Sequence, residues 1–352
     1  MIPFDFEFTS LPNTVYFGEG KVDLLPQITK GYHKIFAISE QRTAHLVSAL
    51  IEQLGEDKVF PYYEVIQHVP DSLVKKTKAE FDAFQPDLLL AIGGGSSIGL
   101  AKMLAKESGT PILAVPTTYA GSEMTNIWGT TTDEGKITGR DDKVLPRYVI
   151  YDPNLTATMP VGLAATSAMN AMAHLMEAVY AQDNNPVTYQ NSLVGIQHLK
   201  KGMQLIAKTK ELTREANKSI LLGAYLAGKG LCEVPMALHH KAAHTLGGSF
   251  GVEHSQGHTI MQAYVLQYQW EYLPSTVKED FIKVFESDYP PKALKSLASG
   301  MGAPLTLKEI GFKENDIEKA AKIMAERPYP NPAPLTPEGL TKLMRNAFEG
   351  NV

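Results

Sequence analysis

The pattern of hydrophobic and polar positions changes once along the chain, near Met159. Before this point short apolar runs alternate with longer amphipathic runs, and after it amphipathic segments with helical periodicity dominate. Strands that alternate with helices indicate crossover connections and a parallel sheet. The pattern therefore predicts an α/β, Rossmann-like domain over residues 1–158 and an all-α helical domain over residues 159–352.

The apolar runs predict five buried strands, and the amphipathic runs predict helices with one apolar face. The strands are expected at residues 34–39, 59–65, 87–95, 111–118 and 148–153. The helices are expected at residues 41–54, 72–84 and 97–107, and in the second domain at 166–180, 186–208, 212–229, 235–246 and 277–285. Prolines punctuate the last third of the chain, at Pro290, Pro291, Pro304 and along residues 328–337.

Composition excludes several classes of function. The 352 residues carry a formal net charge of -5, so there is no basic excess to bind nucleic acid. The most apolar window, residues 88–101, is interrupted by glycines and is shorter than the ~20 residues of a membrane span. Residues 1–13 lack the regions of a signal peptide, and a single cysteine, Cys232, excludes an internal disulfide. We expect a cytoplasmic protein that binds neither nucleic acid nor a membrane.

Two polar loops follow consecutive predicted strands. Residues 93–96 (Gly-Gly-Gly-Ser) open a helix, where free N–H groups and the helix dipole favour a phosphate. The turn matches neither the Rossmann fingerprint nor the Walker A loop, and alone it is equally well explained as a turn without a ligand. Residues 116–123 end the next strand, and the carboxyl ends of parallel strands share one edge of a sheet. Together the loops favour a dinucleotide or another phosphorylated ligand.

Histidines gather in the second domain. Five of the ten lie close together in the sequence: His239, His240, His244, His254 and His258. His240 and His244 are four residues apart and share a helix face, and a break at Gly247 and Gly248 is expected before His254. This spacing is common in metal sites, and histidine also suits proton transfer near neutral pH. The isolated His33, His45 and His198 are expected to be structural.

A second pair, Asn170 and His174, is also four residues apart on a predicted helix, with Glu177 one turn further on. A carboxylate at position 170 would offset the charge of a divalent ion, whereas the amide offers only a dipole. The cluster is therefore expected to bind a metal weakly or not at all.

These motifs together resemble the iron-containing alcohol dehydrogenase superfamily. Its GGGSxxDxAK motif is matched by residues 93–102, its Pro-Thr-Thr loop by residues 116–118, and its metal-site motifs by Asn170/His174, His240/His244 and His254. Asn170 and Gly99 stand where the family has aspartates. Both departures, with residues 119–123, 170–174 and 239–248, resemble one branch of the family, the maleylacetate reductases.

The resemblance implies the dehydroquinate synthase-like fold, a homodimer, and reduction of the C=C bond of maleylacetate to 3-oxoadipate by NADH or NADPH in the breakdown of aromatic compounds, without a metal. The implied catalytic residues are His174, His240, His244, His254, Asn170 and Lys241, with Arg140 as a further candidate to bind a substrate carboxylate. The implied cofactor-binding residues are Ser39, Gly94, Gly95, Ser96, Thr117, Thr118, Tyr119 and Ser122. Ser39 and Glu40 would face the adenine ribose and leave the choice between NADH and NADPH open.

Three alternatives stay open on the sequence. A metal-dependent alcohol or polyol dehydrogenase would use Asn170 as an unusual ligand. A lyase of the dehydroquinate synthase type would use NAD without net consumption, and a nucleotide-binding sensor would catalyse nothing.

Overall fold

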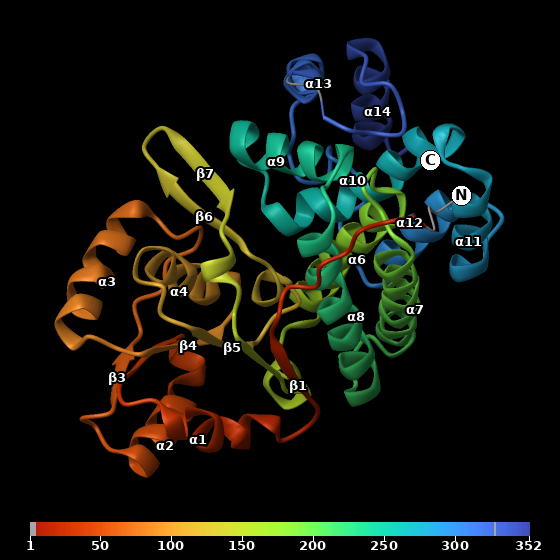
Figure 1. The fold of residues 1–352 in the computed structure, drawn as a ribbon. Coiled ribbons are helices and arrows are strands. Elements are labelled where there is room, and N and C mark those ends of the chain that lie inside the picture. The colour runs from red at the N-terminus through yellow and green to blue at the C-terminus, as the bar shows by residue number, and fades with distance from the viewer. Residues whose placement is uncertain (1–4, 327–328) are drawn as a thin grey trace. The chain divides into compact units, whose positions relative to one another are not determined.

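The chain divides into two compact units, seen in Figure 1 in a computed structural model that describes residues 5–326 and 329–352. One unit is Thr9–Thr158, and the other consists of residues 159–352 with the described residues before Thr9. Residues 1–4, at the start of the stretch considered for a signal peptide, and residues 327–328, where the proline-rich stretch begins, lie outside the described residues.

The first unit contains a six-stranded parallel sheet with the order β1-β8-β5-β4-β2-β3. Its strands are β1 (Thr14–Phe17), β2 (Ile35–Ser39), β3 (Val59–Tyr62), β4 (Leu88–Gly93), β5 (Ile112–Pro116) and β8 (Tyr148–Tyr151). Every residue of β2, β4 and β5 is buried, as expected for a parallel sheet that is covered on both faces. The five strands expected from the apolar runs are all present.

Helices cover the two faces of this sheet, as Figure 1 shows. Side chains of α1 (Leu25–Ile28) and α2 (Ala44–Leu54) pack on one face, and those of α3 (Asp71–Phe84) and α4 (Gly95–Ser108) pack on the other. The chain leaves β2 for β3 on one side and then returns to β4 on the other side. The strand order therefore reverses between β2 and β4, and ligands of open α/β sheets bind at such a switch point, outside the carboxyl ends of the strands.

The sequence prediction missed three strands in this unit. One is β1, a half-buried edge strand of four residues that pairs only with β8. The others are β6 (Ile127–Thr132) and β7 (Gly135–Arg140), which form an antiparallel hairpin that is rich in threonine and glycine. The hairpin lies on α4, where the Lys106 ammonium sits 3.5 Å from the centre of the Trp128 ring. A short helix, α5 (Pro153–Thr156), ends the unit.

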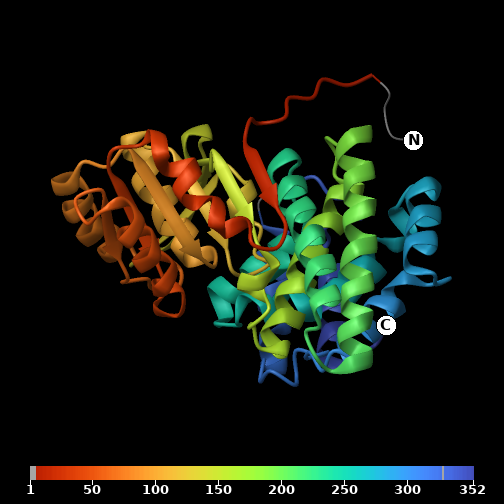
Figure 2. The same ribbon diagram turned by 90° about the horizontal axis from the view of Figure 1, so that it is seen from below.

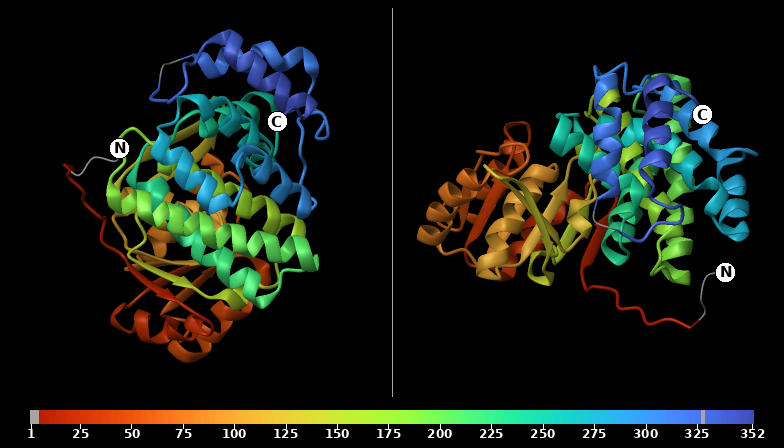
Figure 3. Two further views of the ribbon diagram at one scale, coloured as in Figure 1. Left: turned by 90° about the vertical axis from the view of Figure 1, so that its right-hand side faces the viewer. Right: turned by 90° about the horizontal axis from the view of Figure 1, so that it is seen from above.

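The second unit is helical. Its helices are α6 (Val161–Tyr180), α7 (Pro186–Thr209), α8 (Arg214–Glu233), α9 (Leu238–Phe250), α10 (His254–Gln269), α11 (Ser275–Phe285), α12 (Pro290–Gly300), α13 (Ile317–Ala325) and α14 (Pro337–Glu349). Helices α7 and α8 run side by side, as Figure 2 shows. Their backbones approach closely at Gly223, where an added Cβ would lie 2.6 Å from Leu199. Helices α13 and α14 pack together with α9 and α10 around a separate core (Figure 3).

The structure corrects two expectations for the helical unit. Helix α9 does not break at Gly247 and Gly248 but continues to Phe250 and ends at Gly251, whose φ of 69° suits a glycine. An interior glycine costs only about 1 kcal/mol, which packing can offset. The second correction concerns the last third of the chain, where no helix was expected beyond residue 285. Pro290 and Pro337 are the first residues of α12 and α14. Helices α10, α12, α13 and α14 were not predicted.

Within the described part of the chain, no single helix has both the length and the apolar character needed to cross a bilayer. One pair, α8 and α9, passes on length and composition together but is bent by 96°.

Candidate active site

The glycine turn lies at the carboxyl end of β4 and leads into α4. Gly93 is required there, because an added Cβ would lie 2.2 Å from the hydroxyl oxygen of Ser97. Gly95 and Ser96 are the first two residues of α4 and are half-exposed. The N–H groups of a helix's first turn have no partner within the helix, so this end of α4 fits a phosphate.

A charged pair joins three strand ends at the switch point of the sheet. The backbone N–H of Gly94 donates to Oε1 of Glu40, 3.3 Å away, and Nε of Arg42 lies 2.9 Å from Oε2 of the same carboxylate. The Arg42 guanidinium also donates to the hydroxyl of Thr117, at the end of β5. Sequence reasoning did not single out Arg42, although it lies three residues after Ser39 at a strand end where ligands bind.

The predicted cofactor-binding residues divide by exposure. Gly95, Ser96, Thr118 and Ser122 are half-exposed. Ser39, Thr117 and Tyr119 have no exposed surface. The hydroxyl of Ser39 lies 2.9 Å from that of Thr43, and burial raises the pKa of Tyr119, whose hydroxyl meets Thr156. The side chains of Ser39 and Tyr119 therefore have partners within the protein, and their predicted contacts with the cofactor stay predictions.

The buried Lys102 secures the second polar loop. Its Nζ donates to the carbonyl oxygens of Ser122 at 2.6 Å, Thr125 at 2.7 Å and Ile127 at 2.9 Å, and to the Thr125 hydroxyl at 2.9 Å. The ammonium thus binds three carbonyls along the segment that leads from the short 3-10 helix Ser122–Met124 into β6. The sequence motif contained Lys102 but gave no reason for it, because its partners lie 20–25 residues away along the chain.

Six imidazoles of the helical unit form one continuous group, which we call the imidazole cluster: His174, His239, His240, His244, His254 and His258. His174 Nδ1 lies 2.7 Å from His240 Nε2, and His239 Nε2 lies 2.9 Å from His258 Nδ1. His258 is central, with its ring centre 4.9 Å from that of His240 and 4.5 Å from that of His254. The structure therefore brings together the four predicted catalytic histidines, from α6, α9 and α10.

The histidines of the imidazole cluster differ in solvent exposure. His258 and His239 are buried, His254 is half-buried and His244 is exposed. Burial lowers the pKa of His239 to about 3 and holds the pKa of His258 well below its usual value. Both inner rings are therefore neutral near pH 7, and the outer rings meet solvent. His239 and His258 were not predicted as site residues, although His258 lies one helical turn after His254.

Glu177 is the acidic residue of this region, and its side chain is fully buried. Its Oε2 lies 2.5 Å from Nδ1 of His240, and both carboxylate oxygens accept backbone N–H groups at the start of α9. Burial alone would raise the pKa of Glu177, but the contacts with His240, His239 and the N–H groups lower it below its usual value. The ionised carboxylate of Glu177 is therefore in direct contact with the imidazole of His240.

Three buried polar atoms of α6 and α10 lack a hydrogen-bond partner within the described residues. They are Oδ1 of Asn170, Nε2 of His258 and Oε1 of Gln262. Buried polar atoms are rarely left unsatisfied, and exceptions mark functional sites or bound water. We read them as attachment points for water or for a polar group of a ligand.

The donor set around Asn170 does not fit a tightly held divalent ion. Asn170 supplies a neutral oxygen, and the nearby carboxylate of Glu177 is already bound to N–H groups. Nδ1 of His174 and Nε2 of His240 face each other at 2.7 Å, the separation of a hydrogen bond rather than of two ligands around one ion. Among the described residues, no three His, Cys, Asp or Glu side chains are arranged to hold a metal.

Two predicted cationic residues lie outside the imidazole cluster. Lys241 follows His240 on α9 and is half-buried. Arg140 ends β7 in the other unit, is exposed, and donates to Oδ1 of Asn126 at 3.1 Å. Their predicted contacts with substrate carboxylates stay predictions.

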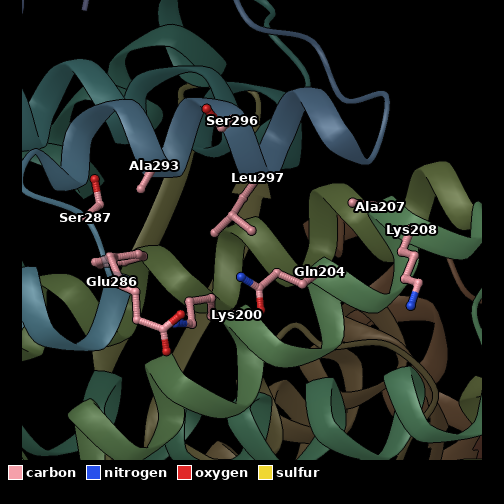
Figure 4. A pocket seen from close by; sticks show the side chains of 10 residues that line it. Lys200, Gln204, Ala207, Lys208, Glu286, Ser287, Ala293, Ser296 and Leu297 are labelled. Atoms are coloured by element: carbon pink, nitrogen blue, oxygen red, sulfur yellow. The ribbon is translucent and has the colours of Figure 1, made fainter.

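A separate pocket lies between α7, α11 and α12, as the close view in Figure 4 shows. Lys200 and Glu286, whose charged atoms are 3.1 Å apart, line it together with residues such as Gln204 and Ser287. None of the predicted site residues lines this pocket.

Comparisons with known proteins agree over nearly the whole chain. Residues 12–153 match the family described as iron-containing alcohol dehydrogenase, and residues 164–348 match the C-terminal part of the same family. The chain is 40% identical to maleylacetate reductase 1 of Cupriavidus pinatubonensis and 38% identical to a maleylacetate reductase of Sphingobium indicum, with 98% of each chain covered.

Solved structures give the same result. A crystal structure of maleylacetate reductase from Agrobacterium tumefaciens is similar with a TM-score of 0.93 and 31% identity, covering 99% of both chains. The enzyme of the same name from a Rhizobium strain gives a TM-score of 0.94 at 31% identity, again over 99% of both chains. The expected fold, a parallel α/β unit followed by a helical unit, is confirmed.

Proposed function

Since this chain belongs to the iron-containing alcohol dehydrogenase family, we propose that it is an oxidoreductase that reduces the C=C bond of maleylacetate with NADH or NADPH to give 3-oxoadipate. One observation supports this choice most: the predicted catalytic histidines form one cluster, with the neutral Asn170 one helical turn before His174. The chain is also about 40% identical to maleylacetate reductases. The remaining steps concern what this chain's own residues do.

The α/β unit supplies the residues proposed to hold the cofactor. The half-exposed N-terminus of α4, at Gly95 and Ser96, suits the pyrophosphate, and Thr118 and Ser122 border the same edge of the sheet. When bound, the reduced nicotinamide supplies hydride to the conjugated double bond.

The imidazole cluster supplies the donors that the reaction needs. Addition of hydride to an enone leaves negative charge on the ketone oxygen, and a proton must then reach carbon. We assign stabilisation of that charge to His174, His240 and His254, with His240 acting as the imidazolium, which donates from Nε2 while Nδ1–H stays bonded to Glu177. We assign proton delivery to the exposed His244 or to His254. Asn170 is proposed to bind a polar group of the substrate by donating from its amide N–H, because a ketone or carboxylate oxygen can only accept. Its Oδ1, which has no hydrogen-bond partner among the described residues, can accept from water.

A divalent ion would polarise the ketone in a metal-dependent relative. The donors around Asn170 do not fit such an ion, so no step is assigned to one, and we propose that the reaction is metal-independent. Lys241 and Arg140 are proposed to bind the substrate carboxylates.

The cofactor, the assembly and the location of the protein complete the proposal. The cofactor is proposed to be NADH or NADPH, because Glu40 would repel a 2′-phosphate that Arg42 would attract. The protein is proposed to be a cytoplasmic homodimer, and the half-buried Cys232, the only cysteine, fits a reducing compartment.

The direct test is to incubate the protein with maleylacetate and NADH or NADPH and to measure both cofactor loss and product. The proposal predicts equal amounts of oxidised cofactor and 3-oxoadipate. Cofactor oxidation with simple alcohols or aldehydes, but not with maleylacetate, would favour the alcohol dehydrogenase alternative. Turnover without net cofactor oxidation would favour a lyase.

A further inference from the structure

A buried carboxylate on α6 caps the start of a different helix, α9. Oε1 of Glu177 accepts the N–H of His239 at 2.7 Å, and Oε2 accepts the N–H groups of Ala237 at 3.0 Å and His240 at 3.3 Å. Ala237 itself, at the N-cap of α9, has no side chain that can cap. Glu177 therefore satisfies N–H groups that α9 leaves unpaired, and the positive end of the helix dipole favours its negative charge.

The same carboxylate dictates which nitrogen of His240 carries a proton. Nδ1 of His240 lies 2.5 Å from Oε2, and an ionised carboxylate can only accept hydrogen bonds. Nδ1 must therefore be protonated and donate to Glu177. The other ring nitrogen, Nε2, is thereby directed at Nδ1 of His174, 2.7 Å away.

Glu177 also fixes the spacing of the two histidines. His174 lies three residues before Glu177 on α6, and His240 lies on the first turn of α9 that Glu177 caps. One side chain thus sets the position of α9 against α6 and the orientation of the ring that links them. A cap supplied within α9 would satisfy the N–H groups but could not hold His240 in this way.

We propose that Glu177 is a positioning residue for the reduction. It keeps Nδ1 of His240 protonated and so directs Nε2 of the same ring toward His174 and the residues that we assign to the substrate. This inference rests on the proposed function for its kinetic consequence. The inferred Nδ1–H form of His240 does not depend on the identity of the substrate.

The experiment compares the wild type with Glu177→Gln. Glutamine keeps the size of the side chain but is neutral and has one acceptor oxygen instead of two, so it cannot accept from the three backbone N–H groups and from Nδ1 of His240 together. Where its amide N–H faces Nδ1, it donates and permits the Nε2–H form. Long-range ¹H–¹⁵N spectra of the imidazoles, recorded without substrate, report the protonated nitrogen. We expect His240 to change from the Nδ1–H form to the Nε2–H form or to a mixture of both.

Kinetics complete the test. We expect kcat with maleylacetate to fall by about 10²–10⁴-fold, the range seen when the partner that orients a catalytic histidine is neutralised, while the KM for NADH changes by less than about threefold. Glu177→Asp, which keeps the charge, is expected to retain the Nδ1–H form and more activity than Glu177→Gln. A matched control is Glu309→Gln, which replaces a carboxylate that accepts the backbone N–H of Leu305 and should leave kcat nearly unchanged.

Several results would overturn the inference. One is an unchanged His240 form in Glu177→Gln, and another is a kcat within about threefold of wild type. If both Glu177 variants fail to fold, the carboxylate acts in stability alone, which also contradicts the inference. If the wild type does not reduce maleylacetate at all, the proposed function fails, whereas the spectra still decide the role of Glu177.

Discussion

At the scale of single residues, the main feature of the imidazole cluster is that its two innermost rings carry no charge. Six imidazoles share one ionised carboxylate, and the two innermost rings, His239 and His258, are held neutral by burial. The outer rings, His244 and His254, meet solvent. This arrangement suits donation of a proton to a bound anion.

Removing the imidazole of His240 or His254 tests this account of the cluster. We expect His240→Ala and His254→Ala to lower kcat by about 10²–10⁴-fold, because a positioned acid or donor is lost. Circular dichroism should show a folded protein in both cases. His45→Ala, at an exposed histidine of α2, is the control and should keep full activity. Near-normal turnover in both cluster variants would exclude these roles.

The charged pair at the switch point makes a prediction about cofactor choice. Glu40→Gln removes the carboxylate that neutralises Arg42, and a free guanidinium attracts a 2′-phosphate. We expect the ratio of kcat/KM for NADPH to that for NADH to rise by about tenfold, equivalent to ~1.4 kcal/mol. Arg42→Gln should shift the ratio in the opposite direction. Equal changes for both cofactors would mean that the pair does not face the ribose.

At the scale of elements, Lys102 and the loop it holds behave as a unit. Lys102→Met leaves three carbonyl oxygens without their charged donor, so we expect a loss of about 2–3 kcal/mol in unfolding free energy and a raised KM for NADH. Lys106→Met on the same helix loses only a cation–π contact with Trp128, worth about 0.5–1 kcal/mol. Urea unfolding and steady-state kinetics check both. Similar losses in the two variants would argue against a special role for Lys102.

A second element-scale prediction concerns the start of β2 and β4. The backbone N–H groups of His33 and Lys34 donate to Asp87 at 2.8–3.0 Å, and although burial raises the pKa of Asp87, these bonds lower it below its usual value. A lowered folded-state pKa stabilises the fold above about pH 4 and loses that effect as the pH falls through it.

Asp87→Asn should therefore be less stable than wild type at pH 6, and the difference should shrink toward pH 3. Urea unfolding across this range measures it. Asp82→Asn, at an exposed residue of α3, is the control and should show little pH-dependent difference. A constant gap between wild type and Asp87→Asn would contradict the assignment.

The sequence predicted the elements that carry their own pattern. The five buried strands and the long helices α6, α7 and α8 have periodicity that spans many residues, so their existence follows from local sequence. Strand β1 and the hairpin β6–β7 depend on partners elsewhere in the fold, and no local signal separates them from loops. Helix α9 continues through two glycines because packing on α10 and α13 outweighs their propensity.

Part of the candidate site was also predicted, because those residues follow a local sequence signal. His174, His240, His244 and His254 follow a motif that can be read along the chain. Glu177 and His258 lie one turn after His174 and His254, at i+3 and i+4. Both were noted in the sequence, but their spacing alone gave neither a role. Arg42 and Lys102 act through contacts between strand ends and loops, which only the fold reveals.

At the scale of the whole molecule, two units divide the chemistry. The α/β unit offers a helix N-terminus and a charged pair at the switch point of its sheet, and the helical unit offers the imidazole cluster. The similarity to maleylacetate reductases covers both units, since 98% of the chain is matched. We propose that imidazoles, rather than a bound metal, support reduction of the enone.

The most direct measurement follows NADH consumption with maleylacetate before and after exhaustive chelation, with the metal content of the same samples determined by mass spectrometry. The account predicts an unchanged rate in protein whose metal content is far below stoichiometric. Loss of activity on chelation, with recovery on adding stoichiometric iron or zinc, would contradict it.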